Sequence, residues 1–156
     1  MQTDKINQSP YFENSQSYRD TLADETHVVF IADELGIGNA FETIKSKLGN
    51  GQNNCLTLIY SIPDNPVQPL FKAELESIEK RYPAQILTYY VSGKGILPID
   101  QTDKIQQILE IVINCNTRKR MQFEMRIQAE QAETVAGRLT YLGINPTQII
   151  HKPFNN

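Results

Sequence analysis

Apolar residues along the chain follow two alternating patterns, which predict alternating strands and helices. Short, nearly continuous apolar runs, typical of buried strands, occupy 28–31, 55–60 and 85–91. Each run is followed by apolar residues at helical spacing, namely Phe41, Ile44 and Leu48; Phe71, Leu75, Ile78 and Tyr82; and Ile105, Ile108, Leu109 and Val112. A fourth strand at 122–127, a helix marked by Ala132, Val135, Ala136, Leu139 and Leu142, and a short strand at 148–151 complete the series. This order predicts a three-layer α/β/α fold around a doubly wound, five-stranded parallel sheet.

The fourth strand differs from the others because apolar and polar residues alternate along it. Phe123, Met125 and Ile127 alternate with Glu124 and Arg126. Strict alternation is typical of a strand with one face toward the core and one toward water. We interpret the polar face as one that its helix covers only partly, in preference to a buried site.

Individual residues predict where the helices begin and end. Asn39, with Glu42 three residues later, reads as a capping box, and Gly49 is placed for a left-handed helix end. Pro69 suits a first helical turn, Asp100 is a candidate cap, and Gly143 is predicted to close the last helix.

Composition favours one soluble domain. The chain has 156 residues, 40% of them hydrophobic and 21% charged, with a net charge of −3. We predict a polar N-terminal arm over 1–26 and a folded domain over 27–156. No run approaches the roughly 20 apolar residues of a membrane span, and the N-terminus is not a signal peptide, so we expect a cytoplasmic protein without a membrane partner.

Neither nucleic acid nor a metal ion is expected as a ligand. The basic cluster at 118–120 is only three residues long and reads as a solvated loop. Cys55 and Cys115 are far apart and have no neighbours at metal-ligand spacing, so we expect packed or half-buried thiols.

The predicted sheet implies where a ligand would bind. In doubly wound sheets, ligands bind beyond the carboxyl ends of the strands, where the strand order reverses. That rule gathers the loops at 33–39, 61–65, 92–95 and 128–130. The first loop opens onto a helix N-terminus, which favours an anion such as a phosphate. Whether Gly36 and Gly38 let a nucleotide approach or only allow the turn is left open.

Three segments carry a resemblance to a known family. Residues 32–39 read A-D-E-L-G-I-G-N, where the family's first loop reads A-G-G-T-G-I-T-P. Residues 56–92 are similar to its L-x-Y-G-x-R…F-x-x-E-L…Y-P…V-S stretch, and residues 137–154 to its closing L-x-x-x-G-(I/V)…I-x-x-E-x-F. The chain thus resembles, over about 27–154, the C-terminal NAD(P)-binding domain of the ferredoxin reductase superfamily. The acidic residues at 33, 34 and 130 add similarity to siderophore-interacting flavoreductases.

The resemblance implies a Rossmann-like sheet with strand order 3-2-1-4-5, whereas a flavodoxin-like domain would have order 2-1-3-4-5. It implies NAD(P) as cofactor, with FAD reached only through a partner. Lys94 would substitute for the residue that receives the 2′-phosphate or ribose, although a loop lysine is more often only solvated. Phe154 would stack on a partner's flavin, although packing against the domain's own surface is the favoured interpretation. The cofactor-binding residues that it implies are Gly36, Ile37, Gly38, Asn39, Ser92, Lys94, Gln128, Glu130 and Phe154, with no catalytic or metal-binding residue.

The chain departs from the family pattern in ways that leave two functions open. Asp33 and Glu34 replace glycines that face the pyrophosphate, residues 128–130 replace the C-G-P that places the nicotinamide, and the 26 polar residues before the first strand cannot form a flavin-binding barrel. Because hydride transfer needs the flavin, the chain would not be a competent enzyme alone. The first hypothesis is a stand-alone NAD(P)-binding domain of an electron-transfer oxidoreductase, with the flavin domain on a separate chain. The second is a catalytically inactive, reductase-like binding or regulatory module. A flavoprotein or a second copy is the expected partner.

Overall fold

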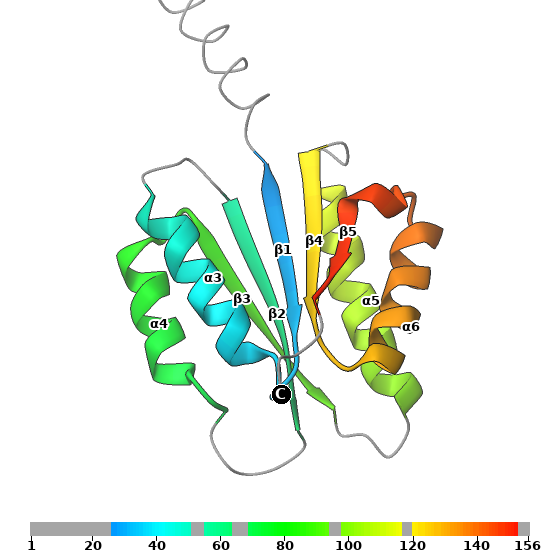
Figure 1. The fold of residues 1–156 in the computed structure, drawn as a ribbon, viewed down its shortest axis with the longest axis horizontal. Coiled ribbons are helices and arrows are strands. Elements are labelled where there is room, and N and C mark those ends of the chain that lie inside the picture. The colour runs from blue at the N-terminus through cyan, green and yellow to red at the C-terminus, as the bar shows by residue number, and fades with distance from the viewer. Residues whose placement is uncertain (1–25, 51–54, 64–68, 94–97, 117–119, 153–156) are drawn as a thin grey trace, which may run out of the picture.

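The computed structural model describes residues 26–50, 55–63, 69–93, 98–116 and 120–152. Figure 1 shows a central sheet with α3 and α4 on one side and α5 and α6 on the other. The elements, in chain order, are β1 (His27–Ala32), α3 (Ile37–Gly49), β2 (Cys55–Pro63), α4 (Lys72–Arg81), β3 (Ile86–Gly93), α5 (Pro98–Asn114), β4 (Met121–Arg126), α6 (Ala129–Tyr141), the 3₁₀ turn η2 (Pro146–Gln148) and β5 (Ile149–His151). The predicted three-layer α/β/α fold is confirmed.

The sheet is parallel throughout, and its strand order is β3-β2-β1-β4-β5. This confirms the order 3-2-1-4-5 and rules out the flavodoxin-like order. After β1 the chain builds outward through β2 and β3, and then returns to pair β4 with the other side of β1. The order therefore reverses between β1 and β4, and the loops that follow these two strands lie at the switch point.

Two apolar clusters hold the layers together, one on each side of the sheet. Alternate residues of β1 enter different clusters: Val28 and Phe30 pack with α3 and α4, while Val29 and Ile31 pack with α5 and α6. All four are at most 2% exposed, as the continuous apolar run predicts for a central strand.

Several predicted helix ends are wrong by a few residues. Helix α3 begins at Ile37 and has no side-chain cap, so Asn39 lies inside its first turn and the capping box does not form. At the other end Asn50, at φ −84°, is the cap, so Gly49 is the last helical residue and is not in the left-handed region. Helix α4 begins three residues after Pro69, preceded by Phe71 in the left-handed region. Helix α5 begins at Pro98, which places Asp100 inside it.

The predicted end of the last helix is confirmed. Gly143 has a φ of 93°, a value that favours glycine. Its amide donates to the Thr140 carbonyl and the next amide, from Ile144, donates to the Leu139 carbonyl. This pair of bonds is the Schellman arrangement, which satisfies carbonyls at the end of α6.

The interpretation of β4 as a half-exposed strand is wrong. Glu124 is 5% exposed and Arg126 is 1% exposed, so its polar face is buried as fully as its apolar one. The two side chains pair with each other, which offsets part of the cost of burying their charges.

Some expectations lie outside the described residues. They include Lys94, Phe154, most of the basic cluster at 118–120, and the N-terminal arm apart from Thr26. Within the described ranges, no helix is long and apolar enough to cross a membrane. The same residues contain no group of three or more His, Cys, Asp or Glu side chains that could hold a metal ion.

Candidate functional site

The turn between β1 and α3 is organised by Asp33. One carboxylate oxygen, Oδ1, accepts hydrogen bonds from the amides of Leu35 (3.0 Å) and Gly36 (2.9 Å). The backbone carbonyl of Asp33 also accepts the amide of Ile37 at 2.9 Å. A carboxylate in this position accepts hydrogen bonds from amides at the N-terminus of the helix. Without it, these amides would be available to an anionic ligand.

The same carboxylate joins the two loops of the switch point. Its second oxygen, Oδ2, accepts the amide of Gln128 at 3.1 Å, at the start of α6. The Asp33 amide in turn donates to the Arg126 carbonyl at 3.2 Å. Three amides from two loops therefore converge on one built-in anion, where a phosphate-binding loop would present them to a ligand.

Gly36 is required by packing against β4. A Cβ atom added to it would lie 1.8 Å from the Arg126 carbonyl oxygen, far inside contact distance. Its φ of −95° is accessible to any residue, so the left-handed region is not the reason for glycine here. The question that the sequence left open is answered for Gly36: it lets the turn approach β4.

The next amides along α3 differ from those that Asp33 holds. Among the described residues, the N–H groups of Gly38 and Asn39 have no hydrogen-bond partner. A Cβ atom at Gly38 would meet only the Phe71 ring, at 3.9 Å. The first turn of α3 thus keeps two amides that a diphosphate oxygen could accept.

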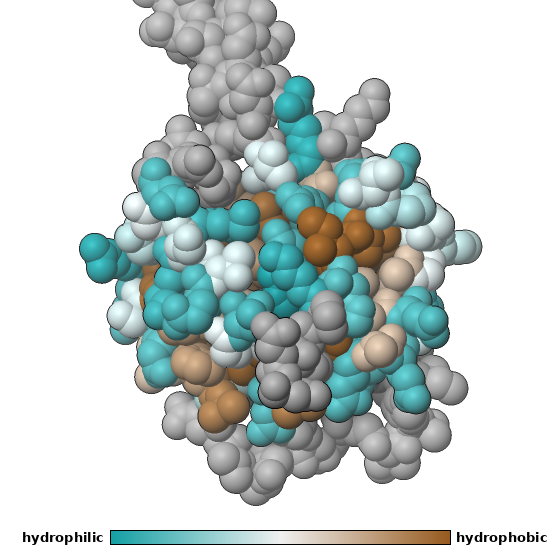
Figure 2. Space-filling view, viewed as in Figure 1, coloured by the Kyte–Doolittle hydropathy of each residue, from teal (hydrophilic) through white to brown (hydrophobic). Residues whose placement is uncertain are grey.

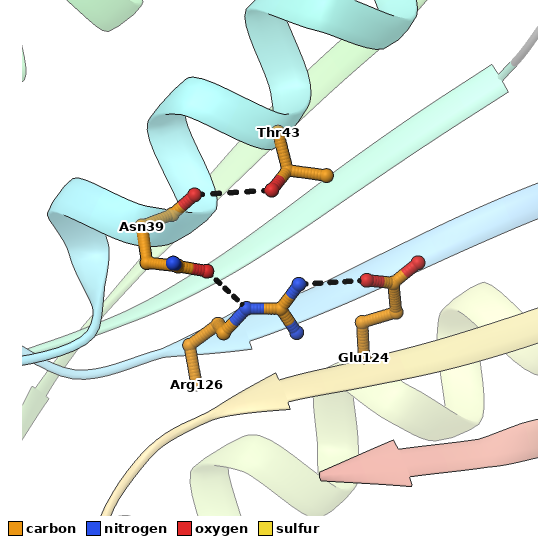
Figure 3. Close-up of polar contacts among 4 residues, drawn as sticks. All are labelled: Asn39, Thr43, Glu124 and Arg126. Carbon is orange, nitrogen blue, oxygen red and sulfur yellow. Dashed lines mark hydrogen bonds and ion pairs between the residues drawn. The ribbon is translucent and has the colours of Figure 1, made fainter. Parts of the chain in front are cut away.

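Beneath this turn lies a chain of polar contacts that is buried at Glu124 and Arg126. Figure 3 shows the Arg126 guanidinium between Asn39 of α3 and Glu124 of β4. Its Nε donates to Asn39 Oδ1 at 2.6 Å, and its Nη2 donates to Glu124 Oε1 at 2.8 Å. The remaining nitrogen, Nη1, is buried and has no partner among the described residues. The contact explains why Asn39 stands in the first turn of α3: it binds β4 and does not cap the helix.

Tyr60 lies on the same face and in the same row of the sheet. Ala32 of β1 is paired with Arg126 on one side and with Tyr60 on the other. Burial, followed by the nearby Glu34 carboxylate, raises the pKa of Tyr60 to about 12. The phenol is therefore neutral at pH 7, and within the described part of the chain its buried hydroxyl makes no hydrogen bond of good geometry.

The remaining predicted site residues are spread along the carboxyl edge. Ser92 is near the end of β3, two strands away from β1, and its carbonyl accepts from Lys104 at 3.3 Å. Glu130 lies in the first turn of α6 and is exposed. The structure thus joins Gly36, Ile37, Gly38, Asn39 and Gln128 in one place and leaves Ser92 and Glu130 apart.

Sequence reasoning missed two residues of this site. The alternation along β4 predicts that its helix covers the face of Glu124 and Arg126 only partly, whereas both are buried. One signal was available: opposite charges two residues apart on a strand lie on the same face and can pair there.

Comparisons with known proteins place the fold. Neither a scan against protein-family models nor a search of curated proteins found a match. Among solved structures, the chain is similar to a ferredoxin-NADP+ reductase from Plasmodium falciparum (TM-score 0.70, 18% identity, 86% of this chain and 56% of that one). It is also similar to a ferredoxin-NADP+ reductase from Neisseria gonorrhoeae with bound FAD and NADP (0.64, 16%, 86% and 58%). A third is the cytochrome b5 reductase domain of Ulva prolifera nitrate reductase (0.60, 15%, 81% and 48%).

These similarities confirm the family resemblance at the level of the fold. The chain shares its fold with a part of each of these reductases. It spans only about half the length of each of these neighbours.

Proposed function

We propose that the chain is the NAD(P)-binding unit of a flavin-dependent electron-transfer system, with the flavin supplied by a separate chain. The observation that carries this proposal is the free pair of amides, Gly38 and Asn39, in the first turn of the helix at the switch point of a reductase-like sheet. The diphosphate would bind there, beside Asp33 and not in its place. NADP is favoured over NAD by the bound NADP of the Neisseria gonorrhoeae neighbour.

In this role the chain's own residues bind and orient the cofactor. The Arg126–Asn39 contact fixes the first turn of α3, so that its amides point in one direction before the ligand arrives. When bound, NAD(P) would supply the hydride, and a flavin on the partner would accept it. Glu34 is exposed next to the site and would repel the diphosphate, so we expect modest affinity.

A second candidate function is favoured by the Asp33 contacts. If the three amides held by this carboxylate were the ones that a diphosphate needs, the domain would be a reductase-like binding module that no longer takes a dinucleotide. Protein contacts would then be its role.

Calorimetry with NADPH and NADH separates the two candidates. The first predicts saturable one-to-one binding to the unaltered chain. The second predicts no heat at millimolar concentration for the unaltered chain and binding by Asp33→Gly. The control is Glu34→Gln, which removes a neighbouring charge without touching those amides. If none of the three proteins binds either dinucleotide, both candidates are overturned, because the domain would then neither bind a dinucleotide nor have lost that binding through Asp33.

The flavin part of the proposal needs a second experiment. We expect a neighbouring gene to encode a flavin-binding barrel. The two purified proteins together, and neither alone, should oxidise NADPH with ferricyanide as acceptor. Equal rates for the mixture and for the flavoprotein alone would contradict this part and leave the binding result standing.

A further inference from the structure

One unassigned feature of the described surface is a groove between α6 and β5. It has a volume of about 560 Å³, within the range of sites that hold small molecules. Figure 1 places α6 and β5 at one edge of the molecule, away from the first turn of α3. The residues that line it are Met125, Ala129, Glu130, Ala132, Glu133, Ala136, Thr140, Pro146, Ile149 and His151.

The groove exists because the side chains on one face of α6 are small and the sheet ends at β5. Ala129, Ala132 and Ala136 recur at helical spacing and leave space that larger side chains would fill. Met125, 2% exposed, and Ile149 supply an apolar floor and wall. Figure 2 shows apolar surface around β5 that is bordered by hydrophilic surface.

The charge on the rim has one sign. Glu130 and Glu133 are exposed, and because they are three residues apart on α6 their carboxylates project from neighbouring positions. Among the described residues that line the groove, none is Lys or Arg. On the opposite rim, His151 Nε2 lies 3.0 Å from the Ile127 carbonyl oxygen and donates to it, which holds the ring in place.

We propose that this groove binds a small organic cation, with its apolar body on Met125 and Ile149 and its charged group between Glu130 and Glu133. Charge complementarity selects a cation, and the apolar walls select one with an aromatic or aliphatic body. A peptide added as a further strand fits less well, because β5 has only three residues to pair with. The groove lining does not include the amides of α3.

Three molecules of nearly the same shape test whether the groove prefers a cation: benzamidine (a cation), benzamide (neutral) and benzoate (an anion). Each is titrated into the ¹⁵N-labelled full chain, and amide shifts are followed by NMR. We expect benzamidine to shift the amides of 129–136 and 149–151 in a saturable way, benzamide to do so more weakly, and benzoate to leave them unchanged. Equal effects of benzamidine and benzoate, or shifts scattered over the surface, would overturn the proposal.

Variants test the assignment of residues. The pair Glu130→Gln and Glu133→Gln should weaken benzamidine binding about fivefold, as expected for partly exposed charges. Ala136→Leu should abolish binding by filling the groove. The matched control is Glu74→Gln, which removes an exposed carboxylate from the first turn of α4. Unchanged binding in the double variant, with its melting temperature preserved, would overturn the role of the acidic rim.

Discussion

The two faces of β4 solve the problem of burial in different ways. Toward α5 and α6, Phe123 and Met125 are 0% and 2% exposed and enter an apolar cluster. Toward α3, Glu124 and Arg126 are buried almost as completely and are held by specific polar contacts. The first face is stabilised by the burial of apolar surface. On the second face the buried charges are held by an ion pair and a hydrogen bond.

This difference has a structural consequence. Apolar packing is tolerant of small shifts, whereas an ion pair with a defined hydrogen-bond direction fixes position. The polar face is the one that contacts the first turn of α3, through Asn39. We infer that the charged face of β4 fixes the orientation of the candidate site, and that its apolar face only stabilises the packing against α5 and α6.

The largest expected effect comes from breaking the ion pair on one side only. Glu124→Leu leaves Arg126 charged and buried without its partner, which should lower the free energy of unfolding by about 3–5 kcal/mol. The double variant Glu124→Leu, Arg126→Met should recover most of this loss, because no buried charge remains. Urea denaturation measures both.

The apolar face supplies the control for that experiment. Met125→Leu conserves volume on the same strand and should cost less than about 1.5 kcal/mol. If Glu124→Leu is no more harmful than Met125→Leu, or if the double variant is as unstable as the single one, the charge pair does not have the role assigned to it.

Gly36→Ala should have the next largest effect. The added Cβ atom would collide with the Arg126 carbonyl, so the turn must move away from β4, at a cost of about 1–3 kcal/mol. Gly38→Ala, whose Cβ atom meets only an ordinary contact, should be neutral or slightly stabilising. Thermal unfolding compares them, and equal melting temperatures would contradict the close-approach explanation.

A smaller effect is expected at His27, a polar residue on the α5 side of β1. Its Nε2 lies 2.7 Å from Thr57 Oγ1, and burial lowers its pKa from the usual 6.5, against a weaker opposing contact with Asn116. The unfolded chain therefore binds this proton more readily, so stability is present above about pH 6.5 and falls as the pH decreases below it.

Urea denaturation at pH 7.5 and 5.5 measures this dependence. His27→Gln should lose less stability between the two pH values than the unaltered chain loses. An identical loss in the unaltered chain and in His27→Gln would rule out the linkage.

The smallest effect is expected at Tyr60. Within the described residues the buried Tyr60 hydroxyl has a weak contact with the Leu70 backbone and no hydrogen bond of normal geometry, so Tyr60→Phe removes a poorly satisfied polar group. The variant should be as stable as the parent or more stable, by up to about 1 kcal/mol. A clear loss of stability would mean that the hydroxyl has a partner in solution.

The fold could be predicted because its signals are local and repeated. Apolar runs such as Val28–Ile31 mark strands buried on both faces, and helical spacing such as Phe41, Ile44 and Leu48 follows each one. Helix ends were harder, because a cap depends on one hydrogen bond. Asparagine is a residue type that often caps helices. The Asn39 side chain instead accepts a hydrogen bond from Arg126, 87 residues away in the sequence.

The location of the candidate site could be predicted from the topology of the sheet, but the roles of its residues could not. The rule of the switch point located the loops after β1 and β4, and Gly36, Gly38 and Gln128 do lie there. The roles were not predictable, since alternation in β4 looks the same whether the polar face meets water or a paired charge. Which amides Asp33 occupies likewise depends on backbone geometry that composition does not encode.

The central claim is that the first turn of α3 keeps two amides open to a diphosphate while Asp33 occupies the amides beside them. NMR of the ¹⁵N-labelled full chain titrated with NADPH tests it most directly. The account predicts saturable shifts of the Gly38 and Asn39 amides, larger than those of Leu35 and Gly36. Unchanged Gly38 and Asn39 signals at millimolar NADPH would contradict it.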